Sequence, residues 1–121
     1  MTDIQRIDQN QRRSRGVVHN GFIFLAGQVA NDPIGDIRQQ AREAFAKVDD
    51  MLAQAGSDKT RVMSVTIWLR DMEDYEGFNE VWDQWVVQGQ TPARACGKVQ
   101  LADPRIRVEL IVTAAAAAAA T

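Results

Sequence analysis

The feature that most constrains the fold is a helical pattern enclosed between two strand patterns. Across residues 37–55 the apolar side chains recur at helical spacing, and Asp36 and Gly56 stand where an N-cap and a C′ residue belong. The flanking segments, Phe22–Val29 and Val62–Arg70, are rich in β-branched and aromatic residues. This strand–helix–strand order predicts a right-handed crossover connection within one mixed sheet.

The remaining elements complete the same plan. Asn20-Gly21 separates Val17–His19 from the strand that begins at Phe22, which is a strong hairpin signal. A second helix is predicted from Glu73 to Val87, with an apolar stripe that we assign to the core and that consists of Tyr75, Phe78, Trp82 and Trp85. The stretch Thr91–Val112 is typical of two strands joined by a short turn. The predicted fold is therefore α+β, ordered β-β-α-β-α-β-β, with both helices on one sheet face.

The strand within Val62–Arg70 indicates what covers the other sheet face. Met63, Val65, Ile67 and Leu69 alternate with the second set, which consists of Ser64, Thr66 and Trp68. Two helices cannot cover both sides of the sheet, and the face without helices is too apolar in places to be left in water. We therefore expect a closed homo-oligomer with its sheets facing inward.

Composition limits the functions that the chain can have. Its 121 residues suit one domain, predicted over residues 1–113, followed by a low-complexity alanine-rich tail, 114–121, that we expect to be frayed or disordered. The net charge is −2 without a basic stripe, which argues against nucleic-acid binding. The "RRSR" cluster, Arg12–Arg15, is interpreted as a solvated strand start, although a phosphate or carboxylate role stays open.

Histidine and cysteine usage argues against metal and disulfide chemistry. Cys96 and His19 are the single residues of their types, so an intrachain disulfide and a Cys/His zinc site are both excluded. We expect no cofactor. Neither a signal peptide nor an apolar run of membrane-spanning length is apparent, so the expected location is cytoplasmic, with no membrane partner.

Two charged side chains on the closing strands are candidates for a site. Arg94 and Cys96 are two residues apart and share a strand face, and a guanidinium holds a carboxylate in a two-point fork. Glu109 lies inside an apolar run, where desolvation raises a carboxyl pKa toward that of a proton shuttle. From the residues alone, an ion pair is the commoner explanation of each: Arg94 in a surface or interface pair, and Glu109 with Arg107 or Arg94.

Five ordered stretches of the chain resemble a known family. They are "HNGFIFLAGQVA", "QQAREAFAKVDDMLAQAGS", "VTIWLRDMEDYEGFNEVW", "PARAC" and "VELIVTA". Together they are similar to the reactive intermediate deaminase family (Rid, YjgF-like), whose members are often labelled endoribonuclease L-PSP. The resemblance runs from about Val17 to Thr113 and implies a chorismate-mutase-like fold, a homotrimer, and sites in the clefts between subunits.

The family resemblance also implies a reaction and its residues. The expected reaction hydrolyses 2-imino acids, formed from enamines, to 2-keto acids and ammonia without a cofactor. Arg94 would bind the carboxylate, and Glu109 would position water. Cys96, Gly27 and Asn79 would line the site, with Cys96 as a lining residue rather than a nucleophile.

The sequence departs from the family pattern at two places. Ala26 stands where many members have serine, and the region of Arg13–Arg15 stands where the best-known members have a tyrosine at the pocket mouth. The substrate preference therefore does not carry over. A non-catalytic, small-carboxylate-binding or regulatory trimer is the alternative function, and RNA cleavage is weaker because the chain lacks a histidine pair and a basic groove.

Overall fold

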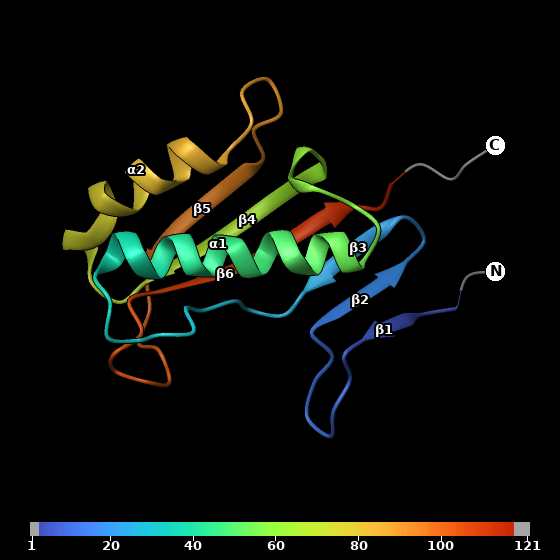
Figure 1. Cartoon of the computed structure of the whole chain (residues 1–121), viewed down its shortest axis with the longest axis horizontal. Helices are drawn as coiled ribbons and strands as arrows, with labels where there is room; N and C mark the ends of the chain where they lie inside the picture. The colour runs from blue at the N-terminus through green and yellow to red at the C-terminus, as the bar shows by residue number, and fades with distance from the viewer. Residues whose placement is uncertain (1–2, 118–121) are drawn as a thin grey trace.

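The computed structural model describes residues 3–117 and is built around one six-stranded sheet, with strand order β1-β2-β3-β6-β4-β5 (Figure 1). The strands are β1 (Gln5–Ile7), β2 (Gly16–His19), β3 (Phe22–Leu25), β4 (Val62–Leu69), β5 (Ala93–Lys98) and β6 (Val108–Ala115). The β4–β5 pair is parallel and the other pairs are antiparallel, so the prediction of a mixed sheet is confirmed.

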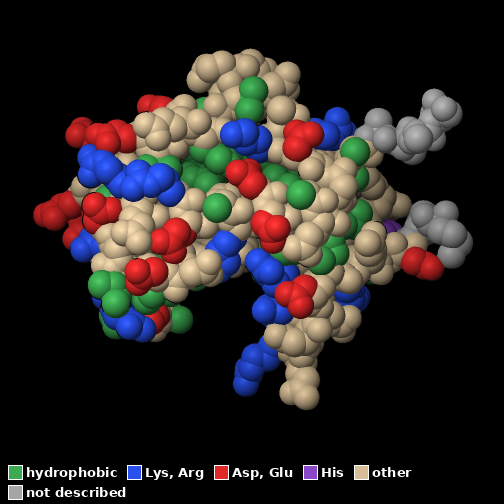
Figure 2. All heavy atoms as spheres, viewed as in Figure 1, with side chains coloured by type: hydrophobic (Ala, Val, Ile, Leu, Met, Phe, Trp, Pro, Cys, Tyr) green, Lys and Arg blue, Asp and Glu red, His purple; other side chains and the backbone are tan. Residues whose placement is uncertain are grey.

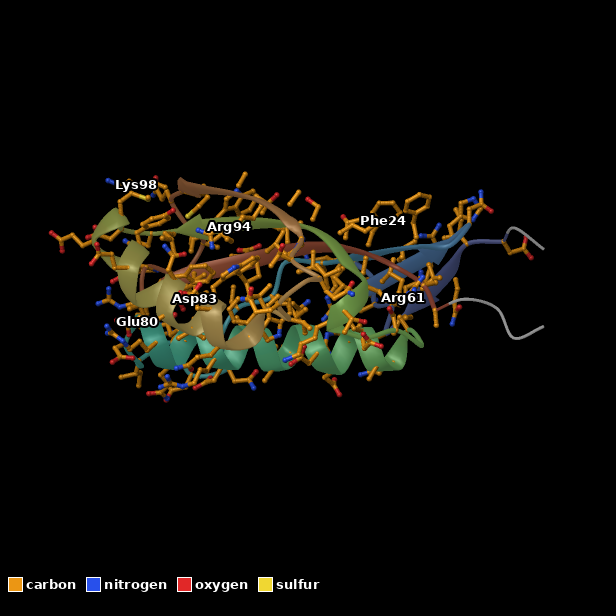
Figure 3. All side chains as sticks on the ribbon, turned by 90° about the horizontal axis from the view of Figure 1, so that it is seen from above. Phe24, Arg61, Glu80, Asp83, Arg94 and Lys98 are labelled. Atoms are coloured by element: carbon orange, nitrogen blue, oxygen red, sulfur yellow. The ribbon has the colours of Figure 1, made fainter. Side chains whose placement is uncertain are left out.

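Two α-helices, α1 (Ile37–Gln54) and α2 (Tyr75–Trp85), cover the same face of this sheet. Figure 3 shows both helices on one side of the strands, as the sequence predicts. Short 3₁₀ turns, Lys59–Arg61 and Met72–Asp74, precede β4 and α2. The opposite face of the sheet carries no helix of the described chain, and we call it the open face.

Helix α1 begins and ends at the expected residues for local reasons. The Asp36 side chain accepts a hydrogen bond from the backbone N–H of Gln39, at 2.9 Å, and such a cap stabilises a helix by about 1 kcal/mol. Gly56 has φ of 78°, the left-handed conformation that a C′ residue adopts at little cost when it is glycine. The N–H of Ser57 then donates to the carbonyl of Leu52, at 2.8 Å, and closes the motif.

The core lies between the helices and the sheet. Phe45 of α1 stacks on Trp85 of α2, with ring centroids 4.4 Å apart, above the fully buried Val65 and Ile67 of β4. The Trp85 indole N–H donates to Asp49 of α1 at 2.9 Å, which satisfies a buried donor and fixes the two helices to each other. Burying a large side chain stabilises the fold by about 1.5–3 kcal/mol, so this aromatic layer holds α2 in place.

The closing strands are not the hairpin that the sequence predicts. Residues 99–107 connect β5 to β6, and the two strands lie on opposite sides of β4. Strand β5 pairs with β4 in parallel through the α2 crossover, whereas β6 inserts between β3 and β4. Strand β6 thereby becomes a central strand with a partner on each side, and β5 becomes the edge strand of the sheet.

The structure differs from the sequence prediction at several element ends. Strand β1 was not predicted, and β3 ends at Leu25 rather than Val29. Met63 is 38% exposed rather than facing inward, because a register shift between Val62 and Ser64 interrupts the alternation of β4. Tyr75 is 39% exposed at the start of α2, so it does not belong to the core stripe.

The predicted alanine tail begins inside a strand. Ala114 is fully buried and Ala115 pairs with Phe22 of β3, so β6 continues past the expected domain end at residue 113. The carbonyl of Ala115 accepts from the Ser57 hydroxyl at 2.7 Å, and that of Ala116 accepts from two nitrogens of Arg61. Residues 118–121 of the predicted tail lie outside the described residues.

The two faces of the molecule differ in character. Figure 2 shows acidic and basic side chains interspersed over the helices, as on a surface in contact with water. The open face instead carries Phe22 and Phe24, which are 47% and 50% exposed and stack on each other at 6.3 Å. Phe24 points away from the helices (Figure 3). In the part of the chain that the structure describes, no helix is long and apolar enough to cross a bilayer.

Candidate functional site

Arg94 lies on the helix-covered side of the edge strand β5. In the parallel pairing with β4, Arg94 is opposite Val65 and Cys96 is opposite Ile67. Val65 and Ile67 are buried beneath the helices, so Arg94 and Cys96 also face the helix side. The shared face predicted for Arg94 and Cys96 is confirmed. Figure 3 places Arg94 between β5 and α2.

Helix α2 supplies the partners of the Arg94 guanidinium. Nη2 donates to Oδ1 of Asn79 at 2.8 Å and to the Tyr75 hydroxyl at 3.3 Å. The guanidinium carbon also lies 4.8 Å from the ring centroid of Trp82, which is within cation–π range. Tyr75, Asn79 and Trp82 are four and three residues apart, so one helix face presents all three to the arginine. We call this group the arginine half-site.

Cys96 lies two residues after Arg94 on the same face of β5. The side chain is half-buried and packs against the core. Burial raises the pKa of the Cys96 thiol, and the positive charge of Arg94 opposes this only in part. A thiol with a raised pKa is protonated near neutral pH, which suits a lining residue better than a nucleophile.

Glu109 lies on the other side of the sheet. Its neighbours in β6, Val108 and Leu110, are fully buried beneath the helices, so Glu109 projects from the open face, where its register partner is Trp68 of β4. Burial raises the pKa of the Glu109 carboxyl. Among residues 3–117 no ion pair with Glu109 forms.

Neither ion-pair explanation of Glu109 holds within one chain. Arg107 pairs instead with Asp74, at 3.0 Å, and Arg94 is occupied by α2. A half-buried carboxyl with a raised pKa and no cation beside it is unfavourable for stability. Such a group is a candidate for acid–base chemistry.

Gly27 lies directly against Glu109. A Cβ at position 27 would be 2.0 Å from Oε2 of Glu109 and 2.8 Å from its Cδ, so the carboxylate occupies the space that any larger residue would fill. The adjacent Gln28 bridges to Leu110 of β6 through two backbone hydrogen bonds, which fixes this approach. Gly27 and Glu109 form what we call the glutamate half-site.

The predicted site residues therefore form two groups rather than one. On the helix side of the edge strand, Arg94 contacts Asn79 and shares its strand face with Cys96, and on the open face Glu109 meets Gly27. Because the two groups lie on opposite faces of one sheet, one chain cannot place Arg94 and Glu109 around the same small molecule.

Sequence reasoning missed the contributions of Tyr75, Trp82 and Gln40 to these groups. Gln40 is fully buried; its Nε2 donates to carbonyls including that of Arg105, and its Oε1 accepts from the N–H of Arg107, at 2.8 Å. It thereby fixes the chain that leads into β6 and to Glu109. The sequence does contain a signal for Gln40: it is a polar residue on the apolar stripe of the first predicted helix, three positions after Ile37.

The departures from the family pattern lie near the start of the sheet. Arg13 is in the loop between β1 and β2 and donates to the carbonyl of Asp8 at 3.0 Å, and Arg15 lies 3.7 Å from the Asp8 carboxylate. The basic cluster therefore lies in the loop that leads directly into β2, and Arg15 is the member of the cluster that forms an ion pair among the described residues. Ala26 precedes the glutamate half-site, and its carbonyl accepts from the Gln28 side chain.

A separate hollow of about 480 Å³ lies at the corner where the loop before α1 meets the loop before β6. Three arginines line it: Arg70, Arg105 and Arg107. Carboxylates of Asp103 and Asp74 pair with the last two, at 2.8 and 3.0 Å. None of the predicted site residues lines this hollow.

Comparison with known proteins places the chain in a family. The family model for endoribonuclease L-PSP matches residues 3–116. The chain belongs to this family. A RutC family protein of Haemophilus ducreyi is 38% identical over 112 residues, covering 93% of this chain and 96% of the relative. The RutC family protein YoaB of Escherichia coli is 35% identical, with 93% and 97% covered.

Solved structures, one of them a member of the YjgF protein family, have the same fold. A member of the YjgF protein family from Neisseria meningitidis is 43% identical, with a TM-score of 0.94 and 98% of each chain covered. An uncharacterized protein from Pseudomonas aeruginosa is 46% identical, with a TM-score of 0.92, covering 94% of this chain and 99% of the other. The resemblance identified from the sequence is confirmed.

Proposed function

We propose that this protein is a homotrimer that hydrolyses 2-imino acids and their enamines to 2-keto acids and ammonia at sites between subunits. The observation that carries the proposal is the division of Arg94 and Glu109 between two half-sites on opposite sheet faces. Each half-site also contains a second predicted site residue: Asn79 lies beside Arg94, and Gly27 lies beside Glu109. A site assembled from two copies would combine a carboxylate anchor with an acid–base group.

Arg94 is assigned to the substrate carboxylate. Its guanidinium is held from one side by Asn79 and lies against the ring of Trp82, so its orientation is fixed before a ligand arrives. Fixed guanidinium donors bind a planar carboxylate at two points, and lysine cannot reproduce this geometry.

Glu109 is assigned to the water and the proton transfers. The carboxylate accepts a proton from water as the oxygen adds to C2 of the iminium, which gives a tetrahedral carbinolamine. Glu109 then passes that proton to the amino nitrogen, and the C–N bond breaks with its electron pair leaving on ammonia. As the C=O bond of the keto acid forms, the hydroxyl gives its proton to Glu109, which returns it to the departing ammonia. One iminium form of the imino acid and one water give one keto acid and one ammonium ion. The raised pKa of Glu109 suits a group that both accepts and returns a proton.

The open face and the free edge of the sheet support the assembly. Phe22, Phe24 and Met63 are apolar and at least 38% exposed, which is unfavourable in water and is relieved when another subunit covers them. A neighbour whose β5 edge approaches this face would bring its own Arg94 toward Glu109. Closed rings of identical contacts are the usual form of such assemblies.

A non-catalytic trimer that binds small carboxylates is the second candidate. The arginine half-site supports it equally, because Arg94, Asn79 and Trp82 suffice to bind an acid. The two functions differ in what they require of Glu109, because a carboxyl without a cation beside it adds nothing to the binding of an anion.

Mixed trimers test the proposal. Arg94→Ala and Glu109→Gln chains are co-refolded in equal amounts, and ammonia release is measured with 2-imino acids generated in situ by an amino-acid oxidase. If each site combines two copies, every mixed trimer has one intact site, and about a quarter of wild-type activity returns. Either variant refolded alone is the control.

The outcomes separate the candidates. Sedimentation equilibrium should give about three times the chain mass of 13.5 kDa. An active wild type whose mixed trimers recover nothing would contradict the shared site. A wild type that binds a 2-keto acid but accelerates the hydrolysis of no imine would favour the binding function.

A further inference from the structure

We propose that the hydroxyl of Tyr75 is a second hydrogen-bond donor to the substrate carboxylate, beside Arg94. This inference rests on the proposed role of Arg94. Tyr75 lies at the start of α2 with 39% of its surface exposed, so a ligand at the arginine half-site can reach it. Its ring centroid is 5.9 Å from the Arg94 guanidinium carbon, and its hydroxyl oxygen is 3.3 Å from Nη2.

The donors of Arg94 explain why Tyr75 is involved. A guanidinium offers two forks to a carboxylate, Nε with Nη2 and Nη1 with Nη2, and both use Nη2. Asn79 accepts from Nη2 at 2.8 Å, a short bond that occupies one of its two hydrogens. A carboxylate held at two points therefore needs the other Nη2 hydrogen, and Tyr75 is the second acceptor on that nitrogen.

The contact between Tyr75 and Arg94 is weak enough to be exchanged. At 3.3 Å it is longer than a typical hydrogen bond between nitrogen and oxygen. The hydroxyl acts there as the acceptor, and among residues 3–117 its own hydrogen is given to no other group. When a carboxylate takes the Nη2 hydrogen, the Tyr75 hydroxyl turns and donates its hydrogen to a carboxylate oxygen. The anion is then bound by the guanidinium fork and the phenol together.

Tyr75→Phe tests this role because it removes the hydroxyl and keeps the ring. Calorimetric Kd values for pyruvate and KM and kcat for imine hydrolysis are compared with those of the wild type. We expect Kd and KM to rise about tenfold, which is the lower end of the loss expected when a hydrogen bond to a charged group is removed. The kcat should stay within about twofold of the wild-type value. Pyruvamide, which lacks the carboxylate, should bind both proteins equally.

The outcomes distinguish this inference from the proposed function. If Tyr75→Phe binds pyruvate as tightly as the wild type, or more tightly, the role of Tyr75 is refuted while that of Arg94 stands. If Arg94→Ala binds pyruvate normally, the anchor assignment fails, and the inference fails with it. A fall in kcat at unchanged KM would also overturn the proposal, because the hydroxyl would then act in chemistry rather than in binding.

Discussion

An alanine at position 27 would displace the carboxylate of Glu109 without removing any functional group. The added Cβ would lie 2.0 Å from Oε2 and 2.8 Å from Cδ. Ordinary contacts begin near about 3.5 Å, so Oε2 has to retreat by more than about 1 Å. The backbone cannot yield easily, because Gln28 is bonded to Leu110 in both directions, at 2.9 and 3.0 Å.

The expected magnitude follows from that displacement. A misplacement of about 1 Å in a catalytic group costs about a hundredfold in rate. We therefore expect Gly27→Ala to lower kcat for imine hydrolysis about a hundredfold. Binding of a 2-keto acid should change little, because the carboxylate anchor is the Arg94 of the neighbouring subunit, which Asn79 of that subunit holds in place.

Ammonia release and calorimetry with pyruvate are the two assays for Gly27→Ala. Gly97→Ala is the matched control, since a Cβ at Gly97 would meet no atom of the described residues within 4 Å and its φ is not positive. A Gly27→Ala variant that hydrolyses imines at the wild-type rate would refute the assignment of Glu109. Equal losses of rate and of pyruvate binding would indicate general damage rather than a displaced carboxylate.

Three further predictions concern the same residues and the end of the chain. Arg94→Ala should abolish pyruvate binding by calorimetry and Arg94→Lys should restore little, whereas Glu109→Gln should still bind pyruvate but lose about a hundredfold in hydrolysis. Because burial raises the folded-state pKa of Glu109, its charged form destabilises the fold. In an Arg94→Ala background, where no neighbouring guanidinium faces the carboxylate, Glu109→Gln should therefore raise Tm at neutral pH, and the gain should vanish as pH falls below the unfolded pKa; a constant gain would contradict this. The low-complexity sequence of the alanine run suggests that it is dispensable. Deletion from Ala115 nevertheless removes the hydrogen bonds to Ser57 and Arg61, so it should lower Tm relative to deletion from Ala118. Equal Tm values for the two deletions would contradict this prediction.

The local elements could be predicted because short-range rules fix them. Helix α1, its Asp36 cap and its Gly56 terminus follow from helical periodicity and backbone sterics, and the Asn20-Gly21 hairpin follows from its turn residues. Both helices share a face because the chain offers too few helices to cover two. The face of β6 from which Glu109 projects could also be predicted, because Glu109 alternates with apolar residues along this strand.

The strand order could not be read from the sequence. The period of a strand says which side chains share a face but not which strand lies beside it. Nothing local indicates that β6 inserts between β3 and β4, so the closing strands resembled a hairpin. The contact between Gly27 and Glu109 depends on this insertion, as does the edge position of Arg94.

The face of Arg94 was decided by the tertiary structure for the same kind of reason. Strand β5 carries small residues on both sides, Ala93, Ala95 and Gly97 on one and Cys96 on the other, so no apolar alternation marks its buried side. Its parallel pairing with β4 places Arg94 beneath α2, against Asn79 and Tyr75. The sequence by itself indicated the candidate site residues, and long-range strand pairing decided that Arg94 and Glu109 lie on opposite faces of one sheet.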